Sequence, residues 1–224
     1  MIDSTRRRVR VLVCGTGFGR IHLRAIAADD DVDLAGILSR GSAASRGVAA
    51  EYGVTCHTSV DDLPDEVATA RILWLTVSGL SVEPSRSANH EALRRHHGNG
   101  MSVLDLDYRA RFWPSEQEAT AQVQQALEHV DVAIGNLEEC RIAVGETDPD
   151  AAALALLERG VEVAVVKQGM MGTLVRTATE RVYVPVTSVR VRNGLGAGDG
   201  FGAVAANAAE AGDEDGFVAQ AVDA

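Results

Sequence analysis

A glycine-rich loop late in the sequence, residues 194–202 (GLGAGDGFG), holds the residues best suited to chemistry. The backbone N–H groups of such a turn can converge on an anion, and a helix that follows adds the positive end of its dipole. Asp199, in the first turn of that helix, could accept a proton from a hydroxyl held beside the anion. Phosphoryl transfer needs this combination of charge stabilisation and a base. The alternative is an ordinary loop in which Asp199 only caps the helix.

A second glycine-rich turn, residues 15–20 (GTGFGR), lies between a predicted strand and a predicted helix, the context of a dinucleotide-binding fingerprint. Gly15 would permit the tight turn, and Gly17 would let the backbone approach a pyrophosphate at the helix N-terminus. Gly19 precedes Arg20, which stands where the third glycine of the pattern would fall. The alternative is a turn that binds no ligand.

The end of the second predicted strand bears on which dinucleotide this turn would prefer. Arg40, with Ser39 and Ser42 close by, stands where an NAD site would place a carboxylate for the ribose 2′-hydroxyl. Arginine and hydroxyl groups suit a 2′-phosphate instead. The segment therefore predicts a preference for NADP(H) over NAD.

Short runs rich in Val, Ile and Leu alternate with Ala-rich helical patterns, which predicts an α/β fold with mostly parallel sheets and helices on both faces. The predicted strands are residues 9–14, 34–38, 54–57, 72–77, 103–106, 132–134 and 161–166, with a hairpin at 173–176 and 181–186. The predicted helices are residues 18–28, 43–52, 85–95, 115–129, 150–159 and 197–211. In the first helix, spacing predicts a buried face of Phe18, Ile21, Ala25 and Ala28. An acidic stretch with Pro64 suggests two domains, residues 1–65 and 66–224.

Composition excludes several classes of protein. Lys and Arg number 21 against 32 Asp and Glu, and this net charge of −11 argues against a nucleic-acid partner. No window approaches the roughly 18 apolar residues of a membrane span. Cys14, Cys56 and Cys140 lie far apart, which predicts buried thiols in a reducing cytoplasm. We therefore expect a cytoplasmic protein that binds small molecules and could form a homo-oligomer.

The segment from residue 68 to 211 resembles the PfkB/ribokinase family of sugar kinases. The resemblance rests on the sequence GAGD at residues 196–199, on NLEE at 136–139, and on VVKQG at 165–169 followed by Gly172. Further segments are similar to the 5-dehydro-2-deoxygluconokinase branch, whose members serve myo-inositol catabolism. These are residues 74–81, 83–86, 104–109, 113–114 and 133–140.

The kinase resemblance implies a ribokinase-like fold, ATP and Mg²⁺ as cofactors, and a role for each matching residue. Asp199 would be the catalytic base, and Gly196, Ala197 and Gly198 would form the anion hole. Asn136 and Glu139 would organise Mg²⁺ and its waters without ligating it directly, or they form a strand-end cap. Lys167 would approach the ATP phosphates, or it is a solvated lysine at the end of a strand.

Substrate recognition is expected beside the same edge of the sheet. Asp105, Asp107 and Arg109 follow a predicted strand at its carboxyl end, where ligands bind in α/β folds. Arg109 suits a substrate carboxylate or a phosphate. The resemblance to the 5-dehydro-2-deoxygluconokinase branch implies phosphorylation of a hydroxyl on a sugar acid of the 5-dehydro-2-deoxygluconate type.

Two alternatives accompany the kinase prediction. Residues 11–20 and 35–42, within a stretch from 9 to 63, resemble thiazolinyl imine reductases of the glucose-fructose-oxidoreductase-like family. That resemblance implies an NADP(H) site at Gly15, Gly17, Gly19 and Arg40. The other alternative is a non-catalytic fused or truncated chain, because the family's N-terminal sugar-binding half and the helices beyond residue 211 are expected to be absent.

Overall fold

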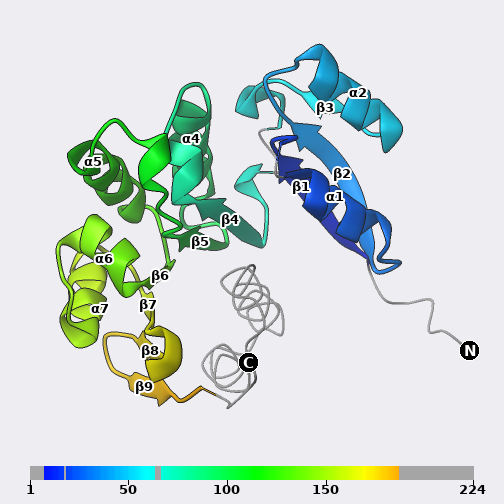
Figure 1. Ribbon diagram of the computed structural model, residues 1–224. Coiled ribbons are helices and arrows are strands. Elements are labelled where there is room, and N and C mark those ends of the chain that lie inside the picture. Colours follow the sequence, from blue (N-terminus) through cyan, green and yellow to red (C-terminus); the bar gives the residue numbers. More distant parts are fainter. Residues whose placement is uncertain (1–7, 18, 64–66, 187–224) are drawn as a thin grey trace, which may run out of the picture. The chain divides into compact units, whose positions relative to one another are not determined.

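The computed structural model describes residues 8–17, 19–63 and 67–186 (Figure 1). The chain divides into two compact units, Met1–Glu66 and Val67–Ala224, and each is described by itself. Both alternate strands and helices, so the predicted α/β class is confirmed. The assignment of residues 1–65 to a dinucleotide-binding half and of 66–224 to a kinase region stays a prediction.

The first unit is a three-stranded parallel sheet in the order β1-β2-β3, with a helix in each connection. Its elements are β1 (Val9–Cys14), α1 (Gly19–Ala27), β2 (Val32–Leu38), α2 (Ala43–Glu51) and β3 (Cys56–His57). A small apolar core joins them, made of Val13, Leu23, Ile37, Val48 and Ala49. Both helices begin and end within two residues of the predicted bounds.

The predicted buried face of α1 is wrong. Leu23 is fully buried, whereas Ile21 is 61% exposed and Ala25 and Ala28 are exposed as well. Residues two apart on an α-helix lie almost on opposite sides, so burying Leu23 turns Ile21 toward solvent. The helix packs instead through residues 19, 23 and 26, which are spaced i, i+4 and i+7. Phe18, the fourth residue of the predicted face, lies outside the described residues.

The prediction of three buried cysteines is also wrong in part. Cys140 is buried, Cys56 is half-buried, and Cys14 is exposed. Val13 points into the core of the first unit. Because successive side chains of a strand alternate between its faces, Cys14 is turned away from that core.

The second unit is built on a six-stranded sheet in the order β4-β5-β6-β7-β8-β9. Neighbours among the first four strands are parallel, and β7-β8 and β8-β9 are antiparallel. The strands are β4 (Ile72–Thr76), β5 (Met101–Asp105), β6 (Val132–Asn136), β7 (Val163–Lys167), β8 (Thr173–Arg176) and β9 (Arg181–Val184). Four helices connect the parallel strands: α4 (Ser85–His96), α5 (Glu116–Leu127), α6 (Leu137–Val144) and α7 (Pro149–Glu158).

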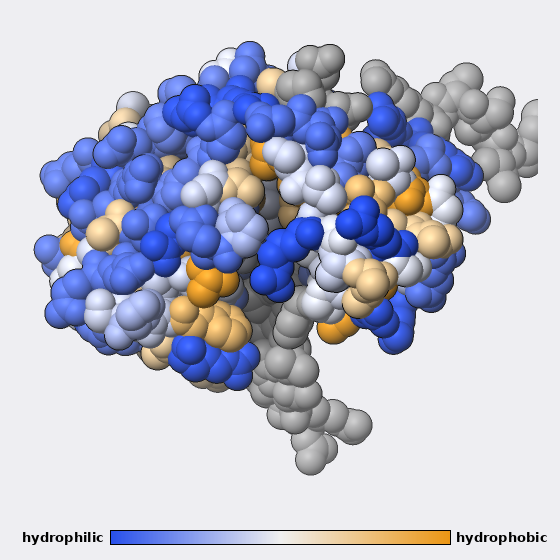
Figure 2. Space-filling view, turned by 90° about the horizontal axis from the view of Figure 1, so that it is seen from above, coloured by the Kyte–Doolittle hydropathy of each residue, from blue (hydrophilic) through white to orange (hydrophobic). Residues whose placement is uncertain are grey.

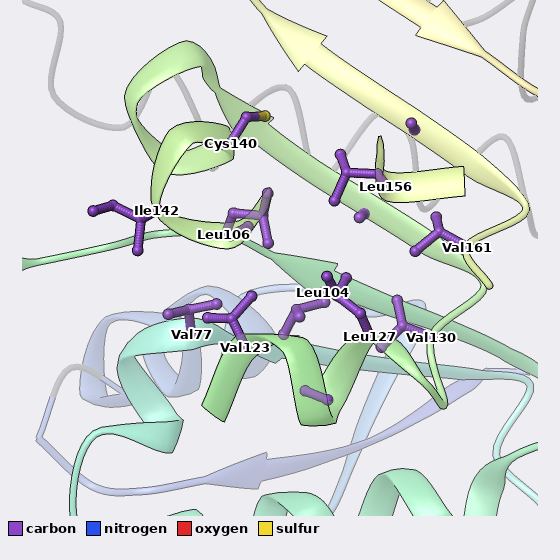
Figure 3. Close-up of a cluster of buried hydrophobic side chains, with 14 of the residues drawn as sticks. Val77, Leu104, Leu106, Val123, Leu127, Val130, Cys140, Ile142, Leu156 and Val161 are labelled. Atoms are coloured by element: carbon purple, nitrogen blue, oxygen red, sulfur yellow. The ribbon is translucent and has the colours of Figure 1, made fainter. Parts of the chain in front are cut away.

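Two apolar clusters lie on the two faces of this sheet. The larger one joins strand residues to all four helices; Figure 3 shows it around Leu104 and Leu106, with Leu127 and Leu156 from helices. In the part of the chain that the structure describes, the second cluster contains only strand residues, among them Val103, Val132 and Val165. Val165 and its neighbour Val166 belong to different clusters, as expected for a strand that is apolar on both faces.

The α6 helix was not predicted, although the sequence carries its start signal. The Asn136 side chain accepts a hydrogen bond from the N–H of Glu139, and the Glu139 carboxylate accepts one from the N–H of Asn136. This reciprocal capping box starts the helix directly after β6. Gly145 ends it with a φ of 83°, a conformation that glycine adopts without strain.

Hydrogen bonds to Asp131 fasten the amino ends of β5 and β6. The Ser102 hydroxyl donates to Asp131 Oδ2 over 2.7 Å, and the Ser102 N–H donates to the same atom over 2.6 Å. Ser102 is fully buried. Folding removes the Ser102 hydroxyl from water, and its hydrogen bond to Asp131 replaces a hydrogen bond to water that is lost. The Ser102–Asp131 contact therefore stabilises this end of the sheet.

The face drawn in Figure 2 is mainly hydrophilic, with apolar side chains in small separate groups. No helix within residues 8–17, 19–63 and 67–186 is long and apolar enough to cross a membrane.

Substitution by alanine should lower the stability of the protein more at Gly172, which directly precedes β8, than at Gly160, which lies between α7 and β7. Gly172 has a φ of 91°, and an added Cβ would lie 2.3 Å from the carbonyl oxygen of Val184. Gly160 has a φ of 103°, but an added Cβ would meet no atom within 4 Å. We expect Gly160→Ala to lower the unfolding free energy by about 1 kcal/mol from backbone strain. Gly172→Ala should cost about 2 kcal/mol more, because a clash adds to the strain.

Urea unfolding followed by circular dichroism measures both variants, with Gly160→Ala as the control for a positive φ without a clash. Equal losses of stability in the two variants would contradict the close packing of Gly172 against β9.

Candidate functional site

The parallel strands of the second unit bring a set of polar side chains to one edge of the sheet. Thr76, Asp105, Asn136 and Lys167 are the last residues of β4, β5, β6 and β7. Thr76 pairs in register with Asp105, and Asn136 pairs with Lys167. Ligands of open α/β sheets bind at this carboxyl edge. The structure thus brings together three residues that the sequence predicted for the site: Asp105, Asn136 and Lys167.

Asp105 and Lys167 form a largely buried pair of opposite charges. Lys167 Nζ lies 4.0 Å from Asp105 Oδ1, and the two side chains are 19% and 9% exposed. Lys167 is the sole lysine of the sequence, and its side chain is partly buried beside Asp105. A lysine held at this depth offers a compact positive charge to an anion at the carboxyl edge.

The surroundings of Asp105 make its carboxyl harder to ionise than that of an ordinary aspartate. Burial raises the pKa of the Asp105 carboxyl to about 6. The positive charge of Lys167 lowers that pKa, while the negative charges of Glu139 and Asp107 raise it. Asp105 therefore responds to any charge that enters this edge of the sheet.

Glu139 is buried at the N-terminus of α6, and one of its carboxylate oxygens takes part in the capping box. Its Oε2 accepts from the Asn136 N–H over 2.7 Å, and the Asn136 Oδ1 accepts from the Glu139 N–H over 2.9 Å. This confirms the strand-end cap that the sequence left open. The second carboxylate oxygen of Glu139 is not part of the cap, so it can act on water or a cation at the same edge.

The side chain of Cys140 lies next to these groups but is unreactive. Burial, and then the charge of Glu139, raise the pKa of its thiol to about 12. The thiolate is the nucleophilic and metal-binding form of cysteine, and it is scarcely populated at neutral pH with such a pKa. Cys140 is therefore a packing residue of α6.

Asp107 and Arg109 lie beyond β5 and form an ion pair. Arg109 Nη2 lies 2.6 Å from Asp107 Oδ1, and the side chains are 57% and 28% exposed. Asp107 also accepts a hydrogen bond from the Ser78 hydroxyl. Sequence reasoning missed Ser78, although its place directly after β4, at the carboxyl edge, was a signal that could have found it.

The predicted catalytic base and anion hole, Asp199 with Gly196, Ala197 and Gly198, lie outside the described residues. Within the described ranges, no three His, Cys, Asp or Glu side chains are grouped so as to hold a metal ion.

In the first unit, the predicted dinucleotide turn has part of the expected geometry. Gly15 has a φ of 86°, and Arg40 is exposed. Gly19, the first residue of α1, is buried, and an added Cβ would lie 3.1 Å from Val13 Cγ1. Gly17 is exposed, with open space where a Cβ would lie. The close contact between Gly19 and Val13 packs the helix on the strand and does not require a ligand.

Comparison with known proteins decides between these alternatives. The family model described as pfkB family carbohydrate kinase matches residues 40–222. The chain belongs to the pfkB family of carbohydrate kinases. A 5-dehydro-2-deoxygluconokinase of Photobacterium profundum is 32% identical over 145 residues, which cover 62% of this chain and 44% of that protein. One of Geobacillus thermodenitrificans is 30% identical over 145 residues, covering 62% and 43%.

Two solved structures share the fold of this chain. A PfkB protein from Polaromonas sp. JS666 matches with a TM-score of 0.73 and 20% identity, covering 96% of this chain and 77% of that one. A putative ribokinase II from E. coli, in complex with ATP and Mg²⁺, matches with a TM-score of 0.67 and 22% identity, covering 91% and 70%. The chain spans less than half the length of the curated relatives that it matches.

The family match also bears on the first unit. It begins at residue 40 and thus includes Arg40, α2 and β3. These residues also lie within the stretch from 9 to 63 that resembles reductases. The resemblance to thiazolinyl imine reductases and the expected NADP(H) site are not supported by these comparisons.

The buried Asp105 predicts how this pfkB-family chain responds to pH. A folded-state pKa of about 6, above the ordinary 3.8, means that the folded protein holds this proton more tightly than the unfolded chain. Stability from this group is present below pH 4 and is lost as pH rises through 6. Asp105→Asn should therefore raise the unfolding free energy at pH 7.5 by about 2 kcal/mol and change it little at pH 4.

Urea unfolding of both proteins at the two pH values measures this difference. An equal gain at pH 4 and pH 7.5 would show that the substitution acts through packing, and that the Asp105 carboxyl is not perturbed.

Proposed function

We propose that this chain is an ATP-dependent kinase that phosphorylates a hydroxyl of a sugar acid of the 5-dehydro-2-deoxygluconate type. The observation that carries the proposal is the convergence of Asp105, Glu139 and Lys167 at one edge of the sheet. Arg109 follows Asp105 by four residues and pairs with Asp107. Family membership supplies the reaction class. The names of the relatives from Photobacterium and Geobacillus supply the substrate class.

Arg109 is the proposed partner of the substrate carboxylate. Its guanidinium is more than half exposed and so is accessible, while its pairing with Asp107 limits its freedom. A guanidinium can bind a carboxylate through two parallel hydrogen bonds, which favours a sugar acid over a neutral sugar.

Lys167 and Glu139 are the proposed partners of the nucleotide and its metal. The Lys167 ammonium would bind ATP phosphate oxygens, because it is a buried positive charge at the edge where anions bind. The carboxylate oxygens of Glu139 and Asp105 are hard donors of the kind that Mg²⁺ prefers, so the residues present fit that ion. Asn136 would contribute by holding Glu139 in place. Bound Mg²⁺ would neutralise charge on the phosphates.

Asp199 is the proposed base, on the strength of the GAGD motif alone. It would accept the proton of the substrate hydroxyl as that oxygen attacks the γ-phosphorus and the bond from this phosphorus to the bridging oxygen breaks, which releases ADP. The N–H groups of Gly196, Ala197 and Gly198 would stabilise the charge on the transferred phosphoryl group. In this proposal residues 66–224 carry the reaction, with the sugar acid and the nucleotide as partners.

The base can be tested directly. We expect ADP to form from Mg·ATP in the presence of 5-dehydro-2-deoxygluconate, and Asp199→Asn to slow this reaction by about 1,000-fold, because the hydroxyl loses its proton acceptor. ATP binding, measured by calorimetry, should change less than twofold. ATP binding without any turnover in the unaltered chain would refute the proposed activity and leave family membership intact.

The substrate class is tested by a pair of arginine variants. Arg109→Met should raise KM for the sugar acid about 100-fold and leave KM for a neutral sugar such as fructose unchanged, because only the acid has a carboxylate for the guanidinium. Arg111→Met is the matched control: Arg111 lies over the ring of Phe112, 4.8 Å from its centroid, and has no proposed role. A preference of the unaltered chain for fructose would contradict the sugar-acid assignment.

A further inference from the structure

We propose that Ser78 is a positioning residue for the substrate: it holds the Asp107 carboxylate, which in turn fixes the Arg109 guanidinium. The inference rests on the proposed function, in which Arg109 binds the carboxylate of the sugar acid. Ser78 lies 31 residues before Arg109, in the short helical turn Val77–Leu80 that follows β4.

The three side chains form a continuous chain of polar contacts. The Ser78 hydroxyl lies 3.0 Å from Asp107 Oδ2 and 2.9 Å from the backbone oxygen of Asp107, and it donates its single proton to this pair of acceptors. The other carboxylate oxygen, Oδ1, lies 2.6 Å from Arg109 Nη2. Among the described residues, each oxygen of the carboxylate thus has a partner, which fixes the plane that the guanidinium must face.

Ser78 can hold Asp107 because its own turn is anchored. Val77 and Leu80 are buried in the larger apolar cluster. Arg86 donates from Nε to the carbonyl oxygen of Leu80 over 2.9 Å and from Nη2 to that of Ser81 over 2.7 Å. Apolar burial and backbone hydrogen bonds thus both restrain the turn from which the Ser78 hydroxyl projects.

The segment after β5 is anchored in the same way. Leu106 is buried, and Tyr108 packs against the same apolar cluster. Asp107 and Arg109 alternate with them and stay partly exposed. The backbone is therefore held by packing, whereas the long Arg109 side chain depends on Asp107 for its order. Ordering such a side chain in advance spares the entropy that binding would otherwise cost.

The first experiment measures the order of Arg109 without any need for turnover. We compare ¹⁵N relaxation at Arg109 Nε in the full chain and its variants; Arg109→Lys assigns the signal by its loss. Ser78→Ala should lower the Nε order parameter by about a third, and Ser78→Thr, which keeps the hydroxyl, should restore it. Asp107→Asn, which weakens the pairing with Arg109, should lower the order parameter as well.

Ser102→Ala is the matched control, because Ser102 also donates to an aspartate, but at the amino end of β5. It should lower stability and leave the Arg109 signal unchanged. An unchanged Arg109 signal in Ser78→Ala would overturn the proposal, and so would an equal change in Ser102→Ala, since the effect would then be general destabilisation.

The second experiment measures kinetics. Ser78→Ala should raise KM for 5-dehydro-2-deoxygluconate about tenfold, with kcat and KM for Mg·ATP within twofold, and Ser78→Thr should recover most of the loss. A fall in kcat with unchanged KM would overturn the positioning role. If the unaltered chain does not turn over, the proposed function fails, while the relaxation measurement still decides whether Ser78 positions Arg109.

Discussion

Four parallel strands, β4 to β7, pair with their neighbours, and as a result every side chain that ends one of them reaches the same edge of the sheet. Asp105 and Lys167 come from β5 and β7, with β6 between them, yet their charged atoms are only 4.0 Å apart. The apolar residues on both faces of the strands pack into two clusters, and this packing holds the strands side by side. The geometry of the site is thus set by the core.

Local signals predicted most of the elements, because the periodicity of apolar side chains and the capping residues act within a few residues. They failed where the structure depends on distant contacts. Which face of α1 is buried depends on how the helix packs on β1 and β2, and the predicted face placed Ile21 inside. The Asn136–Glu139 pattern predicted either a role beside Mg²⁺ or a strand-end cap, but not the helix that it starts. Ser78 meets Asp107 across 29 residues, a contact that neither local sequence contains.

The first unit shows how little a glycine pattern decides alone. Gly15 and Gly19 take the conformation and packing expected of a strand–turn–helix unit, and these properties come from a sharp turn and a close helix. Such turns occur with and without a dinucleotide. The family match, which includes Arg40 and the elements after it, attributes that part of the unit to a kinase family.

Cys140 has a consequence for the chemistry that this edge tolerates. Oxidants attack cysteine as the thiolate, and a thiol with a pKa of about 12 stays protonated in any ordinary cellular medium. The α6 terminus therefore carries sulfur without becoming a redox sensor. Peroxide would thus leave the sulfur beside Glu139 unmodified, and the polar edge would keep its chemistry under oxidative stress.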